Sequence, residues 1–196
     1  MARPRQSKQT RGRLVDEAIE QFLQHGYHGT GLQQILDRVQ VPKGSFYNYF
    51  ASKEELAAAT VRRYAECLGE KMQDALAASP NPLSGLRRFF ERLRSEFEAA
   101  DYTGGCLVAN LGGELEGSQI CREALAEALQ GWRGGVRDAL AEAQDAGLVR
   151  TDIPAGDLAD LLIDTWEGAV IRMKIERSLE PLDRSLTRLL DEYFSP

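Results

Sequence analysis

Residues 41–56, Val-Pro-Lys-Gly-Ser-Phe-Tyr-Asn-Tyr-Phe-Ala-Ser-Lys-Glu-Glu-Leu, predict a short helix anchored by aromatic side chains and followed at once by a longer helix. Pro42 suits the first turn of a helix, where its missing N–H group has no consequence. Phe46 and Phe50 are four residues apart and share a helix face, so the polar residues around them remain outside. Ser52 with a glutamate three residues later has the spacing of a capping box. The short helix therefore spans at most about three turns.

A second amphipathic helix precedes this one. Apolar residues recur at three- and four-residue spacing over residues 31–39, and Thr30 with Gln33 has the spacing of another capping box. Only two residues separate this helix from Pro42. Two short helices with so tight a connection predict a helix-turn-helix, whose second helix enters the DNA major groove.

An earlier helix is predicted over residues 10–25. It ends at Gly26, and Tyr27 is placed as the hydrophobic partner of a glycine C-cap. Three helices then form a small core of their own.

From Arg11 to Leu56 the chain resembles the DNA-binding domain of the TetR family of bacterial transcriptional regulators. The matching residues are Ala18, Phe22, Gly26, Tyr27, Thr30, Ile35, Pro42, Lys43, Gly44, Ser45, Phe46, Tyr47, Tyr49, Phe50, Lys53, Glu54 and Leu56. The resemblance implies an all-α homodimer of about nine helices per subunit. It also implies a basic arm and helix-turn-helix domain over residues 1–51, and a helical ligand-sensing and dimerisation domain over residues 52–196, entered by a connecting helix. The implied partners are double-stranded operator DNA, a second copy and a small-molecule inducer.

Five residues of the predicted recognition helix are candidates for direct contact with DNA. Lys43, Gly44 and Ser45 lie at its start, where free N–H groups and the positive end of the dipole favour a phosphate or a base edge. Tyr47 and Asn48 are the base-edge candidates, because their polar tips project from its middle.

Further contacts with the DNA backbone are suggested by the resemblance at Tyr49, Lys53 and Thr30. For Thr30, capping alone is a sufficient explanation, and for Tyr47 and Tyr49 the alternative is aromatic packing. Arg11 belongs to a basic segment that we expect to be a disordered arm meeting phosphates, although solubility alone also explains such a segment.

Charge is divided unevenly along the chain, which has a formal net charge of −6. Residues 1–63 carry ten Lys or Arg against six Asp or Glu, whereas the remainder carries fourteen against twenty-four. The basic end is therefore the nucleic-acid end.

There is no apolar run of 18 residues and no signal-peptide core, and the three cysteines are widely spaced. We expect a cytoplasmic, nucleoid-associated protein without a membrane partner.

The remainder of the chain predicts a helical bundle broken by proline and glycine turns. Near the C-terminus, two adjacent amphipathic helices precede and follow Pro181, and together they can pair with a second copy in a four-helix interface. The alternative is that both close the core of one subunit. The residues expected at the dimer interface are Leu158, Leu162, Trp166, Leu182, Leu186 and Leu189.

Cys106 is the candidate sensor residue. It follows Gly104 and Gly105 at an expected helix N-terminus, where dipole and N–H groups stabilise a thiolate. Lys174, the only lysine after Lys71, can lower the pKa of that thiol or meet a ligand carboxylate. The alternatives are a small buried hydrophobe for Cys106 and a snorkelling surface side chain for Lys174.

Two short segments, Gly105-Cys106-Leu107 and residues 174–182, resemble the electrophile-responsive branch of the TetR family, which includes the N-ethylmaleimide reductase repressor. That resemblance implies release of DNA when an electrophile or oxidant modifies Cys106. The competing hypothesis is reversible binding of a small hydrophobic drug or metabolite between helices, without cysteine chemistry. Its candidate lining residues are Tyr102, Trp132, Trp166, Arg172 and Met173, although aromatics at helical spacing are more often core.

An enzyme has little support. His25 and His28 are the only histidines, they flank Gly26, and neither HExxH nor GxSxG occurs. We expect no catalytic residues, no cofactor and no metal site. A helical adaptor that binds protein instead of DNA remains the third functional class.

Overall fold

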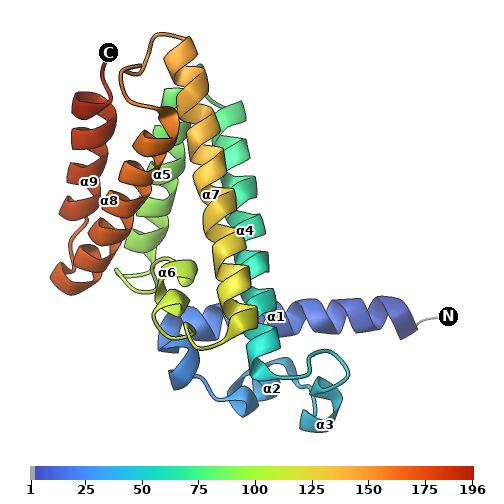
Figure 1. Ribbon diagram of the computed structural model, residues 1–196. Coiled ribbons are helices and arrows are strands. Elements are labelled where there is room, and N and C mark those ends of the chain that lie inside the picture. The colour runs from blue at the N-terminus through green and yellow to red at the C-terminus, as the bar shows by residue number, and fades with distance from the viewer. Residues whose placement is uncertain (1–2) are drawn as a thin grey trace. The chain divides into compact units, whose positions relative to one another are not determined.

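The computed structural model describes residues 3–196, within which it contains nine α-helices, one terminal π-helix and no strand (Figure 1). In chain order the helices are α1 (Arg3–Gly29), α2 (Leu32–Val39), α3 (Lys43–Phe46), α4 (Lys53–Ala77), α5 (Pro82–Ala99), α6 (Leu107–Gly112), α7 (Gln119–Asp145), α8 (Ala155–Glu176), α9 (Glu180–Leu186) and the π-helix η1 (Thr187–Tyr193). The all-α fold predicted from the sequence is confirmed.

The chain forms two compact units whose boundaries differ from the expected division at residue 52. The first unit comprises residues up to Ala65 together with Leu107–Ala128, and the second comprises Glu66–Cys106 and Leu129–Pro196. Contacts within the first unit explain why the later segment joins it. The Cys121 thiol donates to the Glu54 carbonyl at 3.4 Å. The sequence did not indicate this return of the chain, because it depends on long-range packing.

The first unit is built around α1, which is bent near its C-terminal end. Gly26 has φ 71° and ψ 177°, so the predicted glycine break is present inside what is otherwise one helix. Apolar side chains at Leu14, Ala18 and Phe22 are fully buried, as the helical spacing predicts. The basic segment expected to be a disordered arm is instead helical from Arg3 onward. The carbonyl groups of that segment thereby become acceptors within α1, whereas the N–H groups of its first turn have no partner inside the helix.

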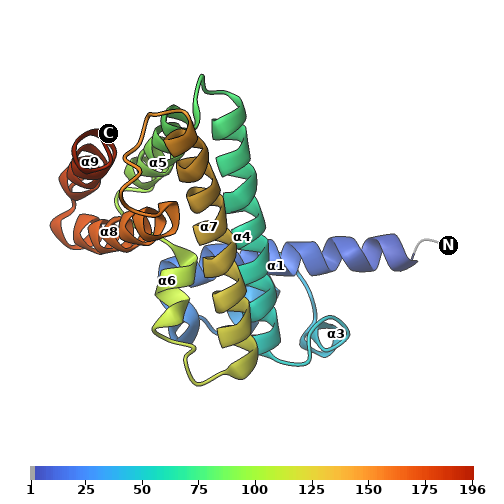
Figure 2. The ribbon, with the colours of Figure 1, turned by 45° about the horizontal axis from the view of Figure 1, so that its top comes forward.

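The second unit is a bundle in which α8 and α9 lie side by side, with α5 against α9 (Figures 1 and 2). Its core is aromatic: the rings of Phe90 and Trp166 have centroids 4.8 Å apart. The predicted break before α5 is present, and the Asn81 side chain caps that helix by accepting from the N–H of Ser84 at 2.8 Å. Gly147, at φ 69°, lies just beyond the end of α7 and is one of the glycine turns expected to break the bundle.

Candidate DNA-binding surface and sensor region

Phe46 and Phe50 anchor the predicted recognition helix in the core of the first unit. Both side chains are buried, and their ring centroids lie 5.7 Å apart. Ile35, Leu36 and Val39 of α2 are buried as well. The prediction that two phenylalanines four residues apart hold this helix in place is confirmed.

α3 itself is shorter than predicted. It comprises Lys43–Phe46, with Pro42 at the N-cap instead of in the first turn. Beyond Phe46, the N–H groups of Asn48 and Tyr49 each donate to the carbonyl three residues earlier, at 3.1 and 2.8 Å. Bonds of this span belong to a tighter turn than an α-helix. The exposed element is therefore one helical turn and the turn that follows it.

The side chains predicted to meet DNA lie on the outside of this element. Tyr47 is 57% exposed, although its ring touches Phe46 edge-on with centroids 5.4 Å apart. Among the other residues predicted to contact DNA, Lys43, Gly44 and Asn48 are exposed, and Ser45 and Tyr49 are partly exposed. Packing against Phe46 thus covers part of Tyr47, and more than half of the residue remains exposed to a ligand.

Arg11 is positioned beside the same element by an aromatic ring. Its guanidinium carbon lies 4.7 Å from the ring centroid of Phe50, and the residue is exposed. A cation–π contact of this kind restrains the side chain while its charge still faces solvent. Arg13, in contrast, donates to the Val39 carbonyl at 2.7 Å and joins α1 to α2. Arg11 is therefore the better placed of the two for a phosphate.

Thr30 is placed differently from the prediction. Its side chain is buried, and its hydroxyl donates to the carbonyl of Gly26 at 2.7 Å, with another α1 carbonyl at 3.1 Å. The N-cap of α2 is Gly31, whose N–H donates to the side chain of Gln34 at 2.7 Å. The predicted capping box of Thr30 and Gln33 is wrong by one residue. The hydroxyl braces the end of α1, and its position does not support a phosphate contact.

Lys53 also points inward. Its Nζ donates to the carbonyl of Tyr27 and lies 4.0 Å from the centroid of that ring. Burial lowers the pKa of Lys53, and the Glu114 carboxylate raises it to a smaller extent. This lysine ties the start of α4 to the end of α1, a structural role that does not support the predicted clamp on a phosphate. Ser52 caps α4 as predicted, since the N–H of Glu55 donates to Ser52 Oγ at 3.1 Å. The Glu55 carboxylate accepts from the N–H of Ala51 at 2.6 Å instead of from that of Ser52, so only one half of the predicted capping box is present.

Cys106 ends a glycine turn and directly precedes α6. Gly104 and Gly105 have φ of 77° and 92°, values that glycine adopts without strain. The position at the start of a helix agrees with the prediction. The thiol side chain, however, is only 6% exposed.

The chain at Gly105 and Cys106 lies along one face of α8. A Cβ on Gly105 would lie 3.2 Å from Val170 Cγ1 and 3.4 Å from Lys174 Cδ. The Cys106 thiol donates a hydrogen bond to the carboxyl group of Glu167. Positions 167, 170 and 174 share a helix face by their three- and four-residue spacing. The predicted proximity of Lys174 to this turn is therefore supported, and Glu167 is an additional neighbour.

Glu167 was not anticipated from the sequence. Its Oε1 atom is buried and has no hydrogen-bond partner among the residues that the structure describes. Burial raises the pKa of Glu167, and the hydrogen bond from Cys106 lowers it to a smaller extent. The available signal was an acidic residue between Trp166 and Gly168, inside an otherwise apolar stretch of α8.

The predicted ligand-lining residues do not share one environment. Trp166 packs against Phe90 and Met173 is fully buried, so both belong to the core. Arg172 is exposed and pairs with Glu176 at 2.8 Å. Packing in the core therefore explains Trp166 and Met173, and an ion pair on the surface explains Arg172.

Tyr102 and Trp132 are the remaining members of that set. Tyr102 is partly exposed, and the Arg177 guanidinium carbon lies 5.7 Å from its ring centroid. Trp132 is 7% exposed, and its indole Nε1 is buried without a hydrogen-bond partner within the described part of the chain. Trp132 thus retains a donor that a ligand acceptor would satisfy.

The six residues expected at the dimer interface are buried inside one subunit. Leu158, Leu162, Trp166, Leu182, Leu186 and Leu189 are each at most 8% exposed. They close the core of the second unit, which was the alternative explanation of the two C-terminal helices. The exposed apolar residues of α8 are instead Leu161, Ile171 and Ile175, at 38%, 57% and 76% exposure. The prediction of interface residues is corrected accordingly.

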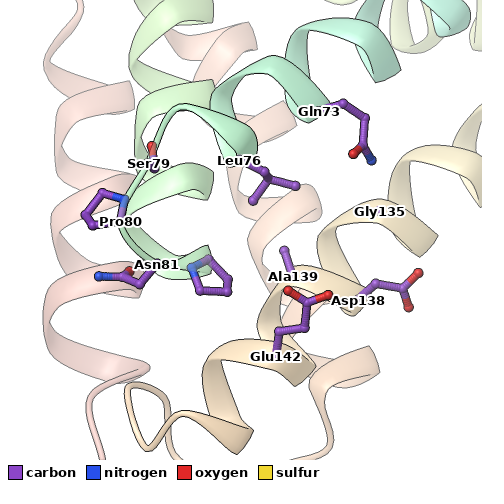
Figure 3. Close-up of a pocket in the computed structure, with 10 residues that line it drawn as sticks. Gln73, Leu76, Ser79, Pro80, Asn81, Gly135, Asp138, Ala139 and Glu142 are labelled. Carbon is purple, nitrogen blue, oxygen red and sulfur yellow. The ribbon is translucent and has the colours of Figure 1, made fainter.

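A surface hollow of about 510 Å³ lies in the second unit between the end of α4, the proline turn before α5, and α7 (Figure 3). Its lining residues are Gln73, Leu76, Ser79, Pro80, Asn81, Pro82, Gly135, Asp138, Ala139 and Glu142. None of the predicted sensor residues is among them.

Over the residues described, no three His, Cys, Asp or Glu side chains are grouped so as to hold a metal ion. None of the helices traced in the structure has both the length and the apolar character needed to cross a bilayer.

Two segments of the chain match domains of known protein families. Residues 14–60 match the bacterial regulatory proteins of the tetR family, and residues 82–189 match the tetracyclin repressor-like C-terminal domain. The first match covers the helix-turn-helix and the second covers most of the bundle. These matches indicate a transcriptional regulator and not an enzyme.

Individual relatives agree with these matches. The chain is 36% identical to the HTH-type transcriptional repressor DhaR of Mycobacterium sp. strain GP1, over 90% of this chain and 88% of DhaR. It is 28% identical to the HTH-type transcriptional repressor NemR of Escherichia coli K12, over 95% of each chain.

Solved structures show the same fold. A regulatory protein TetR from Rhodobacter sphaeroides superposes with a TM-score of 0.85 at 31% identity, over 93% of this chain and 97% of the other. The reduced form of E. coli NemR superposes with a TM-score of 0.87 at 27% identity, over 96% and 97%. The chain belongs to the TetR family of bacterial transcriptional regulators.

Proposed function

We propose that this protein is a repressor that binds an inverted-repeat operator as a homodimer and releases it when a small electrophile modifies Cys106. The DNA-binding part of this proposal rests on the exposed polar turn at residues 43–49, which two buried phenylalanines hold in place. Members of the TetR family bind DNA as dimers and respond to ligands, and the relatives DhaR and NemR are named as repressors.

Within that turn, the roles follow from chemistry and exposure. Lys43 carries an exposed charge and Gly44 presents bare backbone, so both suit a phosphate. Tyr47 and Asn48 carry exposed donors and acceptors that suit base edges in the major groove. Arg11 adds a charge beside the same element.

A reading element of this length contacts few base pairs, so useful specificity requires two copies on one duplex. We infer that the second copy docks on the exposed apolar side chains of α8, at Leu161, Ile171 and Ile175. Positions 161, 168, 171 and 175 fall on one side of the helix, where Gly168 permits close approach. This stripe replaces the buried leucines as the proposed dimer contact.

The sensor half of the proposal rests on the surroundings of Cys106. The thiol contacts a carboxyl group that lacks its full set of donors, and Cys106 is the last residue before the segment that belongs to the DNA-binding unit. Modification of this sulfur therefore changes volume or polarity at the residue that directly precedes α6 in the chain. NemR, a relative at 28% identity, has been solved in a form described as reduced.

One observation favours reversible ligand binding as a second candidate. The buried indole N–H of Trp132 has no acceptor within residues 3–196 of the structure. A bound small molecule with a carbonyl or similar acceptor would satisfy it. Tryptophan fluorescence titrated with candidate inducers tests this mode, which requires no cysteine.

The decisive experiment for cysteine sensing uses DNA from the region upstream of the protein's own coding sequence. It measures whether a thiol reagent releases the protein from this DNA. N-ethylmaleimide is expected to release the wild-type protein and to leave Cys106→Ser bound. Cys67→Ser, which alters a partly exposed thiol, is the matched control and is expected to be released like wild type. Release of Cys106→Ser at the same reagent dose would contradict the cysteine mode.

A further inference from the structure

Glu167 places a carboxyl group directly against the Cys106 thiol. One of its oxygens accepts the hydrogen bond from that thiol, while Oε1 is buried with no partner among the described residues. A buried carboxylate is ordinarily held by two or three donors. The carboxyl group is therefore in surroundings that favour the gain of a proton.

The backbone supports this contact independently. Gly105, at φ 92°, lets the chain approach α8 so closely that a Cβ there would crowd Val170 and would be in ordinary contact with Lys174. Glu167 lies one turn earlier on the same face of α8. The residue after Gly105 is Cys106, so the glycine turn delivers the thiol to the carboxyl group.

We propose that Glu167 is the proton acceptor through which Cys106 reacts with electron-poor alkenes, such as maleimides and quinones. This inference rests on the proposed sensing function of Cys106. It identifies the group that makes a buried thiol reactive, and it assigns to Glu167 a role that the sequence analysis did not predict.

The reaction balances without an added oxidant or reductant. The sulfur forms a bond to the β-carbon of the alkene while its S–H bond breaks, and the proton passes to Glu167. The π electrons move onto the carbonyl group as an enolate, which then takes the proton from the Glu167 carboxylic acid. The net result is addition of S–H across the carbon–carbon double bond. Glu167 returns to its starting state.

Electrostatics favour this route over prior ionisation of the thiol. A thiolate beside a carboxylate would place two negative charges in a poorly solvated site, with the Lys174 ammonium beside the same turn as a nearby cation, and this is less favourable than one negative charge shared by the pair. Transfer of the proton within the pair keeps the total charge constant. Burial raises the pKa of Glu167 and so brings it toward that of a thiol, ordinarily about 8.5, which makes the carboxylate a better general base.

The test is the rate at which N-ethylmaleimide alkylates Cys106 in the full-length protein at fixed pH. Peptide mass mapping reads each cysteine separately, so Cys67 serves as an internal reference. Glu167→Gln keeps the shape and polarity of the side chain but cannot accept the proton. Asp164→Asn removes an exposed acid from the same helix and is the matched control.

We expect Glu167→Gln to slow alkylation of Cys106 by roughly 10²-fold, the usual effect of losing a general base. Glu167→Asp is expected to recover part of the rate, because it restores the base. Asp164→Asn is expected to react like wild type, and the Cys67 rate is expected to be the same in all variants. A group with a merely structural role would not give this ordering.

Two outcomes would overturn different proposals. If wild-type Cys106 reacts and Glu167→Gln reacts equally fast or faster, the proton-acceptor role is wrong, since a carboxylate that only repels a thiolate predicts acceleration. If wild-type Cys106 is not alkylated, the sensing proposal itself fails. If Glu167→Gln does not fold, Glu167→Asp is compared with wild type instead. Its shorter side chain moves the carboxyl group away from sulfur, so alkylation of Cys106 must slow. An alkylation rate equal to that of wild type would then overturn the inference.

Discussion

The carboxylate of Glu114 occupies the space beside Gly26, so that a Cβ on Gly26 would lie 2.4 Å from Glu114 Oε1. That carboxylate accepts hydrogen bonds from the N–H groups of Tyr27 at 3.1 Å and His28 at 2.8 Å. Gly26 interrupts helix α1, and Glu114 supplies acceptors for the N–H groups that follow the interruption. The segment after α6 is thereby fixed to the helix that supports the DNA-reading element.

Gly26→Ala is expected to lower the free energy of unfolding by about 1–3 kcal/mol, because alanine is strained at this positive φ and its Cβ collides with the Glu114 carboxylate. Denaturant unfolding at constant protein concentration measures the change. Gly12→Ala is the matched control in the same helix, where a Cβ meets nothing within 4 Å. It should stabilise by roughly 0.5–1 kcal/mol. Similar losses from both variants would contradict the role of the kink.

Glu114→Ala is expected to destabilise the first unit by about 1–3 kcal/mol, since two backbone N–H groups lose their acceptor. Hydrogen exchange at Tyr27 and His28 should accelerate, while exchange in the second unit should not. Glu116→Ala removes an exposed acid nearby and is expected to change stability by less than about 0.5 kcal/mol. Unchanged exchange in Glu114→Ala would show that the carboxylate does not hold the kink.

The contribution of Glu167 to stability is expected to fall as pH rises above the ordinary pKa of glutamate, 4.5, because burial raises the pKa of this carboxyl group. Below that value both folded and unfolded forms carry the proton. Between it and the folded pKa only the folded form does, so increasing pH favours unfolding. Glu167→Gln should remove this contribution, and its unfolding midpoint should exceed that of wild type more at neutral pH than at acidic pH. A constant difference would contradict the raised pKa.

Lys43→Ala and Asn48→Ala are expected to weaken DNA binding in different ways. Loss of the lysine should reduce affinity for operator and random DNA alike and lower the salt slope by about 1, because one phosphate contact disappears. Loss of the asparagine should reduce affinity mainly for the operator and relax preference at particular base pairs. Fluorescence anisotropy at several salt concentrations distinguishes them. Equal losses on both DNAs for both variants would refute the division of roles.

Ile175→Glu is expected to weaken the homodimer roughly tenfold or more, since it introduces a charge at the most exposed residue of the apolar α8 stripe. Sedimentation equilibrium measures the effect. Leu129→Glu, which alters an apolar residue of α7 that is 46% exposed, is the matched control and should leave association unchanged. If Leu129→Glu dissociates the dimer and Ile175→Glu does not, the proposed contact face is wrong.

Local patterns predicted the DNA-binding half well, because the signals involved span only a few residues. Phe46 and Phe50 at four-residue spacing, Pro42, and the capping residue Ser52 together predicted the short anchored element and the helix after it. The error in the N-cap of α2 is also local. Thr30 and Gly31 are neighbouring candidates, and the N-cap is Gly31, because the Thr30 hydroxyl donates to α1 instead.

The sensor region and the dimer face were less predictable, because both depend on which face of α8 is covered. Periodicity identified the apolar stripe containing Leu158, Leu162 and Trp166, but a stripe alone does not distinguish a subunit core from a subunit interface. The contact between Cys106 and Glu167 joins distant parts of the sequence through the positive φ of Gly105. No spacing rule contains that information.

The most direct test of DNA reading by residues 43–49 is the affinity of the purified protein for DNA from its own upstream region, compared with scrambled DNA at two salt concentrations. The account predicts that a dimer binds one inverted repeat there, with a preference over scrambled DNA that persists at the higher salt. A protein that stays monomeric, or that binds both DNAs equally at each salt concentration, would contradict it.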